Sequence, residues 1–248
     1  MIITDPAFYA IAVPAVLLIG VAKSGFASGF GSLATPLLAI SVTVPQAAAL
    51  MLPLLCLADA LALWTLRRHA DAAVLRQLLP AGLAGIGLGW LAFGALSPKV
   101  VGGMTGAVTL AFLVWNLRFP PQADAPPPGR TATGVLALTS GFTSFIAHSG
   151  GPPIAMALLP RHLAPLVYAG TSAVYFGVIN LSKWVPYGLL GLLDLSNLAT
   201  SVVLMPVAAA GVWLGLWATK HVSPRAFYRL VQWGMFLTGV KLVWDALR

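Results

Sequence analysis

The chain has 248 residues, of which 59% are hydrophobic and only 8% are charged, and its mean hydropathy is +0.91. A soluble domain carries roughly a quarter charged residues, so this composition excludes an ordinary soluble protein and indicates membrane-spanning helices. The basic residues outnumber the acidic ones by 14 to 6. They lie in short loops between apolar runs, which is typical of membrane topology and argues against nucleic-acid binding.

Ten apolar segments follow one another along the chain. In the first half they lie near residues 7–23, 30–42, 45–66, 74–96 and 100–117. In the second half they lie near 131–146, 150–160, 165–188, 195–219 and 225–246. The stretch RFPPQADAPPPGR between the halves predicts an extended connector, because its prolines and polar residues do not suit a buried helix. We therefore predict a first transmembrane repeat over 1–118, a Pro-rich linker over 119–130 and a second transmembrane repeat over 131–248.

The two halves resemble each other in sequence. SGFAS at Ser24–Ser28 matches SGFTS at Ser140–Ser144, and Pro36 matches Pro152 at the same offset. Further matches follow in the same order, namely Pro45 with Pro165, Trp64 with Trp184, and Ser97–Pro98 with Ser223–Pro224. Several matches in one order indicate an internal duplication, which is a common plan among transporters.

The first two segments of each half are short, and the distribution of charge indicates how they cross. If each pair of short segments crosses the membrane twice, or enters it and returns to the same side, most basic residues lie on one side of the membrane. If each pair is a single crossing, the basic residues are divided almost evenly, against the positive-inside rule. The first arrangement gives each half five segments, so the second half is inverted. We predict an all-α polytopic protein of two inverted repeats, with a cytoplasmic linker and both termini outside. Short full spans and re-entrant helices fit equally well.

Each half contains a break rich in glycine and small polar residues, KSGFASGFGS at Lys23–Ser32 and SGFTSFIAHSGG at Ser140–Gly151. Interrupted short segments at matching positions of two halves indicate a transporter's substrate site. The first amides of the helix that follows such a break favour an anion. The predicted substrate-binding residues in the breaks are Ser28, Gly29, Gly31, Ser32, His148, Ser149, Gly150 and Gly151. The alternative is that these glycines only allow close helix packing in lipid.

Four polar residues lie outside the breaks, in apolar runs or at their ends. Asn180, Lys183 and Tyr187 form a polar stripe on one predicted helix and are further candidates for anion binding, although Lys183 could instead reach the outer interface. Asp59 lies within LPLLCLADALALW, where an ionisable residue is rare. It could carry a coupling proton or hold a basic residue, such as Lys183, in place. Two further candidates, His148 and Lys23, belong to the breaks themselves. His148 could contact the anion, transfer a proton or only satisfy a backbone group. Lys23 could attract the anion or reach the interface.

Enzyme motifs such as H-E-x-x-H, G-x-S-x-G and Walker A do not occur in the chain. The single cysteine, Cys56, gives neither an intrachain disulfide nor a cysteine-rich metal site. We therefore predict no catalytic residues, no metal and no cofactor, and transport that is passive or driven by a gradient.

The sequence resembles the TauE/SafE family of sulfite exporters, also called TSUP permeases. The likeness lies in the glycine-rich first break followed by ATPLLAI (Ala34–Ile40), in HSGGPP (His148–Pro153), and in YAGTSAVYFGVINLSKWVPYG (Tyr168–Gly188). It covers nearly the whole chain in order. The resemblance implies a permease that moves small sulfur-containing anions, such as sulfite or organosulfonates, across the inner membrane without ATP.

Together these observations predict a multi-pass inner-membrane secondary transporter that exports a small sulfur-containing oxyanion by alternating access. Its expected partners are the small anionic substrate, membrane lipids and a coupling proton, and no nucleic acid. A passive anion channel and a transporter of another small anionic metabolite are the alternatives. The sequence leaves open the exact anion and whether the protein forms a homodimer.

Overall fold

The computed structural model describes residues 2–23, 33–118, 126–221 and 224–248, and these residues form helices and connecting turns without a strand. The first half contains α1 (Pro6–Lys23), α2 (Ala34–Leu38), α3 (Val44–Leu66), α4 (Ala72–Ala95) and α5 (Pro98–Arg118). The second half contains α6 (Arg130–Ala147), α7 (Gly151–Leu158), α8 (Pro165–Ser182), α9 (Trp184–Leu189), α10 (Leu195–His221) and α11 (Pro224–Leu247). Short 3-10 turns follow α3 at Arg67–His69 and α7 at Leu159–Arg161.

Local sequence signals account for several helix ends. The Thr43 side chain accepts from the Gln46 amide at the start of α3, and the Asp71 carboxylate accepts from the amides of Ala73 and Val74 at the start of α4. Such caps satisfy backbone donors that lack a partner within the helix.

The structure differs from the predicted segments at two places. In the described part of segment 30–42, only Ala34–Leu38 forms an α-helix. The predicted segment 165–188 is divided into α8 and α9 at Lys183. Pro186 explains the second difference, because a proline cannot donate to the carbonyl four residues earlier, and its ring crowds that carbonyl. The division places Lys183 at a helix junction.

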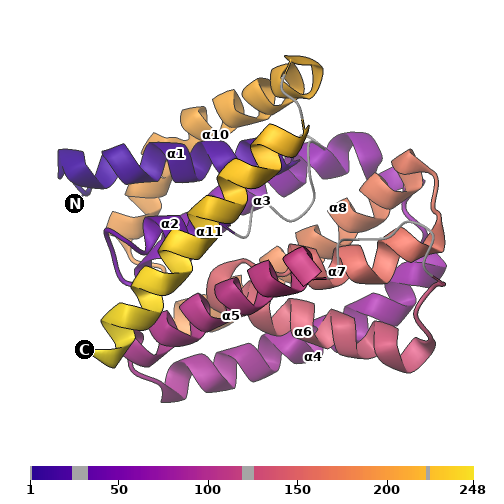
Figure 1. Ribbon diagram of the computed structural model, residues 1–248, viewed down its shortest axis with the longest axis horizontal. Coiled ribbons are helices and arrows are strands. Elements are labelled where there is room, and N and C mark those ends of the chain that lie inside the picture. The colour runs from indigo at the N-terminus through magenta and orange to yellow at the C-terminus, as the bar shows by residue number, and fades with distance from the viewer. Residues whose placement is uncertain (1, 24–32, 119–125, 222–223) are drawn as a thin grey trace.

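The helices pair across the two predicted halves. α1 packs along α10, α4 along α6, and α5 along α11, while α3 and α8 contact each other (Figure 1). If the two halves are equivalent repeats, α1 of the first half corresponds to α6 of the second, and α4 corresponds to α10. The α1–α10 and α4–α6 pairs are then equivalent, which is the pairing that a two-fold relation between the halves would give. Both chain ends lie at the same end of the molecule (Figure 1). The inverted repeat and the division of the chain into two halves remain predictions.

Glycines bring the paired helices into backbone contact. A Cβ added at Gly141 of α6 would lie 1.9 Å from the Gly82 carbonyl oxygen of α4. A Cβ added at Gly20 of α1 would lie 2.4 Å from the Val212 amide nitrogen of α10. Small residues allow this close approach of helices, which is typical of packing in membranes.

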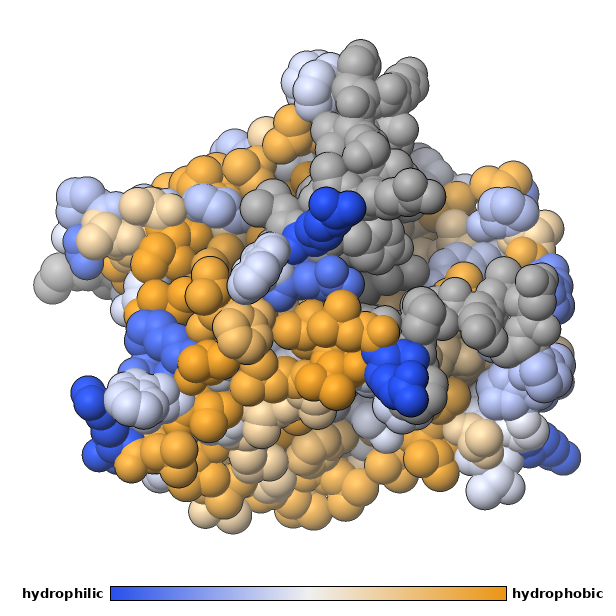
Figure 2. Space-filling model, viewed as in Figure 1, coloured by the Kyte–Doolittle hydropathy of each residue, from blue (hydrophilic) through white to orange (hydrophobic). Residues whose placement is uncertain are grey.

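The outer surface carries large apolar side chains, among them Trp64 with 84% and Trp213 with 71% of its surface exposed. Apolar residues cover much of the face seen in Figure 2. Five helical stretches in the described residues are long and apolar enough to span a membrane, namely Pro6–Lys23, Val44–His69, Ala72–Ala95, Pro98–Trp115 and Leu195–Gly215. The chain is therefore an all-α polytopic membrane protein.

Candidate functional site

The second predicted break is a turn between two helices. α6 ends at Ala147, His148 adopts a left-handed conformation with φ 53°, and α7 begins at Gly151. The His148 amide donates to Ser144 O at 3.0 Å, which is a common way to end a helix with a left-handed residue. The first predicted break lies mostly outside the described residues, including Ser28, Gly29, Gly31 and Ser32. Its first residue, Lys23, is the last residue of α1.

Hydrogen bonds hold this turn against the last turns of α6. Ser140 Oγ donates to Gly150 O at 2.7 Å, and Thr143 Oγ1 donates to Ser149 O at 3.1 Å. A Cβ added at Gly150 would lie 2.7 Å from Ser140 O. Close packing against α6 is therefore a sufficient reason for glycine at position 150. Gly151 is the first residue of α7 and is followed by Pro152 and Pro153, which have no N–H, so the start of α7 offers few amide donors.

Lys183 is fully buried at the junction of α8 and α9. Its ammonium nitrogen lies 2.8 Å from Ser144 O, 2.7 Å from Ser144 Oγ and 2.8 Å from Asn180 Oδ1. A fourth acceptor, His148 Nδ1, lies 3.0 Å away. The ammonium therefore does not reach an outer surface, and acceptors from α6, α8 and the turn after α6 surround it.

The contacts of His148 define its tautomer. Its Nε2 lies 2.9 Å from the carbonyl oxygen of Ala48 in α3. Because a carbonyl can only accept, Nε2 carries the hydrogen, and Nδ1 is left to accept from Lys183. His148 is therefore a neutral imidazole that links α3 to Lys183, and both ring nitrogens are occupied by protein partners.

Asp59 joins α1, α3 and α8. It is buried and forms an ion pair with Lys23 through Oδ1, while its Oδ2 accepts from Asn180 Nδ2 at 2.6 Å. The Lys23 side chain is 22% exposed, and its nitrogen lies 5.2 Å from the ring centroid of Phe176 in α8. Asp59 thus contacts Lys23 directly and reaches Lys183 only through Asn180.

These contacts define one buried polar cluster, which consists of Lys23, Asp59, Asn180, Lys183 and His148. It runs without a gap from α1 through α3 and α8 to the turn after α6, and so connects the two predicted halves. Tyr187 lies beside the cluster: its hydroxyl donates to Phe145 O at 2.6 Å, and its ring meets the Phe145 ring edge to face. The structure therefore brings Asn180 and Lys183 together, whereas the Tyr187 hydroxyl anchors the end of α6.

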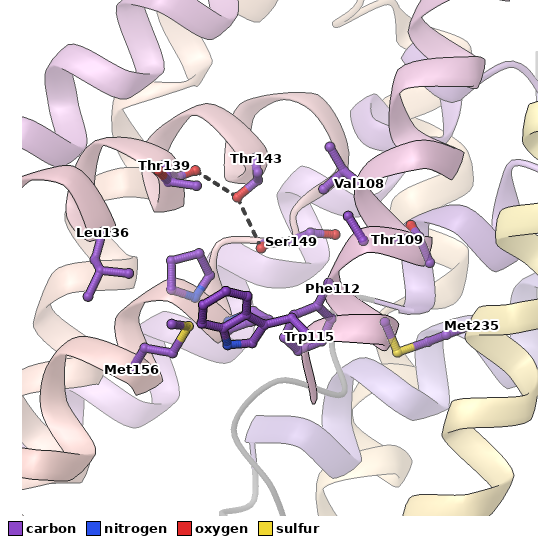
Figure 3. Close-up of a pocket in the computed structure, with 13 residues that line it drawn as sticks. Val108, Thr109, Phe112, Trp115, Leu136, Thr139, Thr143, Ser149, Met156 and Met235 are labelled. Atoms are coloured by element: carbon purple, nitrogen blue, oxygen red, sulfur yellow. Dashed lines mark hydrogen bonds between the residues drawn. The ribbon is translucent and has the colours of Figure 1, made fainter. Parts of the chain in front are cut away.

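A cavity of about 380 Å³ lies beside the last turns of α6, on the side opposite to the buried polar cluster. α5 contributes Phe112 and Trp115, and α11 contributes Met235, while Thr143 and Ser149 come from α6 and the turn (Figure 3). The lining is mostly apolar, and its remaining members are Val108, Thr109, Ala111, Leu136, Thr139, Pro152, Pro153 and Met156. Thr143 faces this cavity while the next residue, Ser144, contacts Lys183, so the last turn of α6 separates the cavity from the buried polar cluster.

The electrostatics of the cluster are unbalanced. It contains two lysines and one aspartate, so it carries one positive charge in excess when both lysines are protonated. A charge in the interior of a membrane protein is costly and usually marks a substrate, ion or proton pathway. No group of His, Cys, Asp or Glu in the described residues is arranged to hold a metal ion.

Sequence reasoning missed three features of this region. It did not identify Ser144, although the repeat match SGFTS ends at this residue. It did not identify the Ala48 carbonyl, which no sequence pattern distinguishes from its neighbours. It also missed the aromatic wall of the cavity formed by Phe112 and Trp115, because aromatic residues in an apolar helix are equally consistent with lipid contact.

Comparison with known proteins agrees with the resemblance in the sequence. A family model described as sulfite exporter TauE/SafE matches residues 12–242 of the 248-residue chain. The curated proteins and the solved structures searched contained no match. The matched family suggests a membrane transporter of sulfur-containing anions such as sulfite. Because the match extends over nearly the whole chain, the protein belongs to the sulfite exporter TauE/SafE family.

Proposed function

We propose that this protein is a secondary transporter that exports a small sulfur-containing oxyanion, sulfite or an organosulfonate, across the inner membrane. The observation that carries the proposal is the full burial of Lys183, which gives the cluster an excess positive charge when it is protonated. Insertion measurements give about 2.5–3.5 kcal/mol as the cost of a lysine at the centre of a membrane helix. A bound anion would offset part of this cost, which gives the protein a physical reason to attract one.

The substrate approaches through the cavity and reaches Lys183 when the last turn of α6 moves. The cavity gives access to Ser149, whereas Lys183 lies behind Ser144 and already faces four acceptors. A protonated lysine has only three N–H donors, so an anion can replace Ser144 or His148 without leaving the ammonium short of partners.

Alternating access follows from the position of the cluster between the two predicted halves. Rocking of one half against the other would break contacts such as Asp59–Asn180 and Ala48–His148, which join helices of different halves. Asp59 or Lys183 then carries the coupling proton. A passive channel would need a continuous polar lining, whereas the cavity wall is mostly apolar. The proposed activity requires no enzymatic step.

Binding by the purified protein tests the proposal. Ligands that bind only the folded state raise the unfolding temperature by mass action. We expect sulfite and small sulfonates to raise the unfolding temperature of the native protein and of Lys241→Met, but not of Lys183→Met. Lys241 is the matched control, because it is an exposed lysine of α11 paired with Asp245. Equal stabilisation of Lys183→Met by sulfite would contradict the proposal.

A further inference from the structure

We propose that the site accepts an anion with a single negative charge, and that the Lys23–Asp59 ion pair sets this number. The inference rests on the proposed function, because it counts the charges that surround the anion near Lys183. It adds a selection by charge and assigns a specificity-determining role to two residues that do not contact Lys183 directly.

The count includes every charged group that faces the cluster in the described residues. α1 contributes Lys23, α3 contributes Asp59, and the junction of α8 and α9 contributes Lys183. α4 and α6 carry only Arg76 and Arg130, each in the first turns of its helix and exposed, and α7 has no charged residue. Residues 24–32, SGFASGFGS, contain no ionisable side chain by sequence alone.

The remaining titratable groups near the cluster are neutral in this arrangement. His148 carries its hydrogen on Nε2 and accepts at Nδ1. Tyr187 and Tyr175 each donate a hydroxyl hydrogen to a backbone carbonyl, and the Cys56 sulfur accepts from the indole N–H of Trp184. The charges of Lys23 and Asp59 cancel within their ion pair. When Lys183 is protonated, the cluster therefore presents one positive charge, that of Lys183.

An anion of charge −1 would make the loaded site neutral, whereas an anion of charge −2 would leave an uncompensated negative charge in the same buried place. Coulomb interactions between groups a few ångströms apart are strong where water is excluded, so the mismatch reduces the affinity for the dianion. The net charge of the Lys23–Asp59 pair therefore determines the net charge of the site when an anion is bound. Removal of Lys23 leaves Asp59 to neutralise Lys183, and removal of Asp59 leaves two positive charges.

Two sulfur oxyanions of similar size and fixed charge near neutral pH test the inference, namely methanesulfonate (−1) and sulfate (−2). Affinities are measured by calorimetry and by ligand-dependent unfolding temperature on the full-length protein in detergent. We expect the native protein to bind methanesulfonate at least about tenfold more tightly than sulfate. Asp59→Asn should reverse this preference, and Lys23→Met should weaken the binding of both anions.

The charge-conserving double variant Lys23→Met/Asp59→Asn is the decisive control. It lacks both members of the ion pair but keeps one excess positive charge. It should therefore recover the affinity for methanesulfonate that Lys23→Met loses and the preference for methanesulfonate that Asp59→Asn reverses. A structural role of the pair predicts the opposite, that the double variant binds no better than the single ones. If a single variant does not fold, the native protein and the double variant still decide the question.

The outcomes separate this inference from the proposed function. If neither anion nor sulfite binds the native protein, the anion site itself is absent. If both anions bind the native protein equally well, or sulfate binds more tightly, the anion site stands and the selection by charge is wrong. Failure of the double variant to recover the preference also overturns the inference.

Discussion

Replacement of Gly141 by alanine should destabilise the protein by separating α4 from α6. The added Cβ would lie 1.9 Å from the Gly82 carbonyl oxygen and 3.1 Å from the Ile86 amide nitrogen. Both atoms belong to the backbone, so no side chain can rotate away, and the helices must shift apart. Overpacking of this kind costs about 1–3 kcal/mol, and alanine returns up to about 1 kcal/mol through its higher helix propensity.

The expected net effect is a loss of about 1–2 kcal/mol. A change of 1 kcal/mol corresponds to about 2–4 °C in proteins of this size. The unfolding temperature, followed by tryptophan fluorescence in detergent, should therefore fall by several degrees. Gly134→Ala is the matched control, because it lies in the same helix and has no atom within 4 Å of the added Cβ. It should leave the unfolding temperature unchanged or raise it. If Gly141→Ala behaves like Gly134→Ala, the close packing of α4 on α6 is wrong.

Three further predictions address the buried residues and the topology. Thr35→Val should raise the unfolding temperature, because the buried Thr35 hydroxyl has no hydrogen-bond partner in the described part of the chain; a fall would show that this hydroxyl is satisfied. Tyr187→Phe should lower stability by about 1 kcal/mol through loss of the bond to Phe145 O, and an unchanged denaturant midpoint would argue against that bond. In spheroplasts and inverted vesicles, an impermeant thiol reagent should reach Pro127→Cys only from the cytoplasm and Ile2→Cys only from the outside; access of both from one side would overturn the inverted topology.

Much of the helical framework could be predicted from the sequence, because long apolar runs in a membrane protein have few alternatives to a helix. α5 ends at Arg118 and α6 begins at Arg130, on either side of the proline-rich stretch, and the role of this stretch as a linker between two repeats remains a prediction. The family resemblance, carried by HSGGPP and the segment around Lys183, is confirmed by the match over residues 12–242.

The partners of the buried charges could not be predicted in the same way. Asp59 and Lys183 were expected to interact, but Asp59 pairs with Lys23 and reaches Lys183 through Asn180. Sequence spacing places residues on a face of their own helix, whereas the facing of two helices depends on their rotation and crossing. The rotation and crossing of two helices are determined by their tertiary packing, such as the glycine contacts between α4 and α6.

The contacts of the residues in the second break could not be predicted from the sequence either. Its glycines and prolines correctly indicated an interruption between two helices, but they did not distinguish a ligand contact from a packing contact. In the structure, Gly150 packs against Ser140, while Ser149 lines the cavity and His148 contacts Lys183. One short segment therefore serves packing and faces two separate environments, and the assignment of a substrate contact within it remains a prediction.

The most direct test of the central claim is the flux of radiolabelled sulfite through the purified protein in liposomes, compared with protein-free liposomes. Lys183→Met and Lys241→Met are reconstituted at the same density. The proposed function predicts a saturable flux that responds to a proton gradient in the native protein and in Lys241→Met, and a flux at the protein-free level in Lys183→Met. A sulfite flux through folded Lys183→Met equal to that of the native protein would contradict the role of the buried lysine.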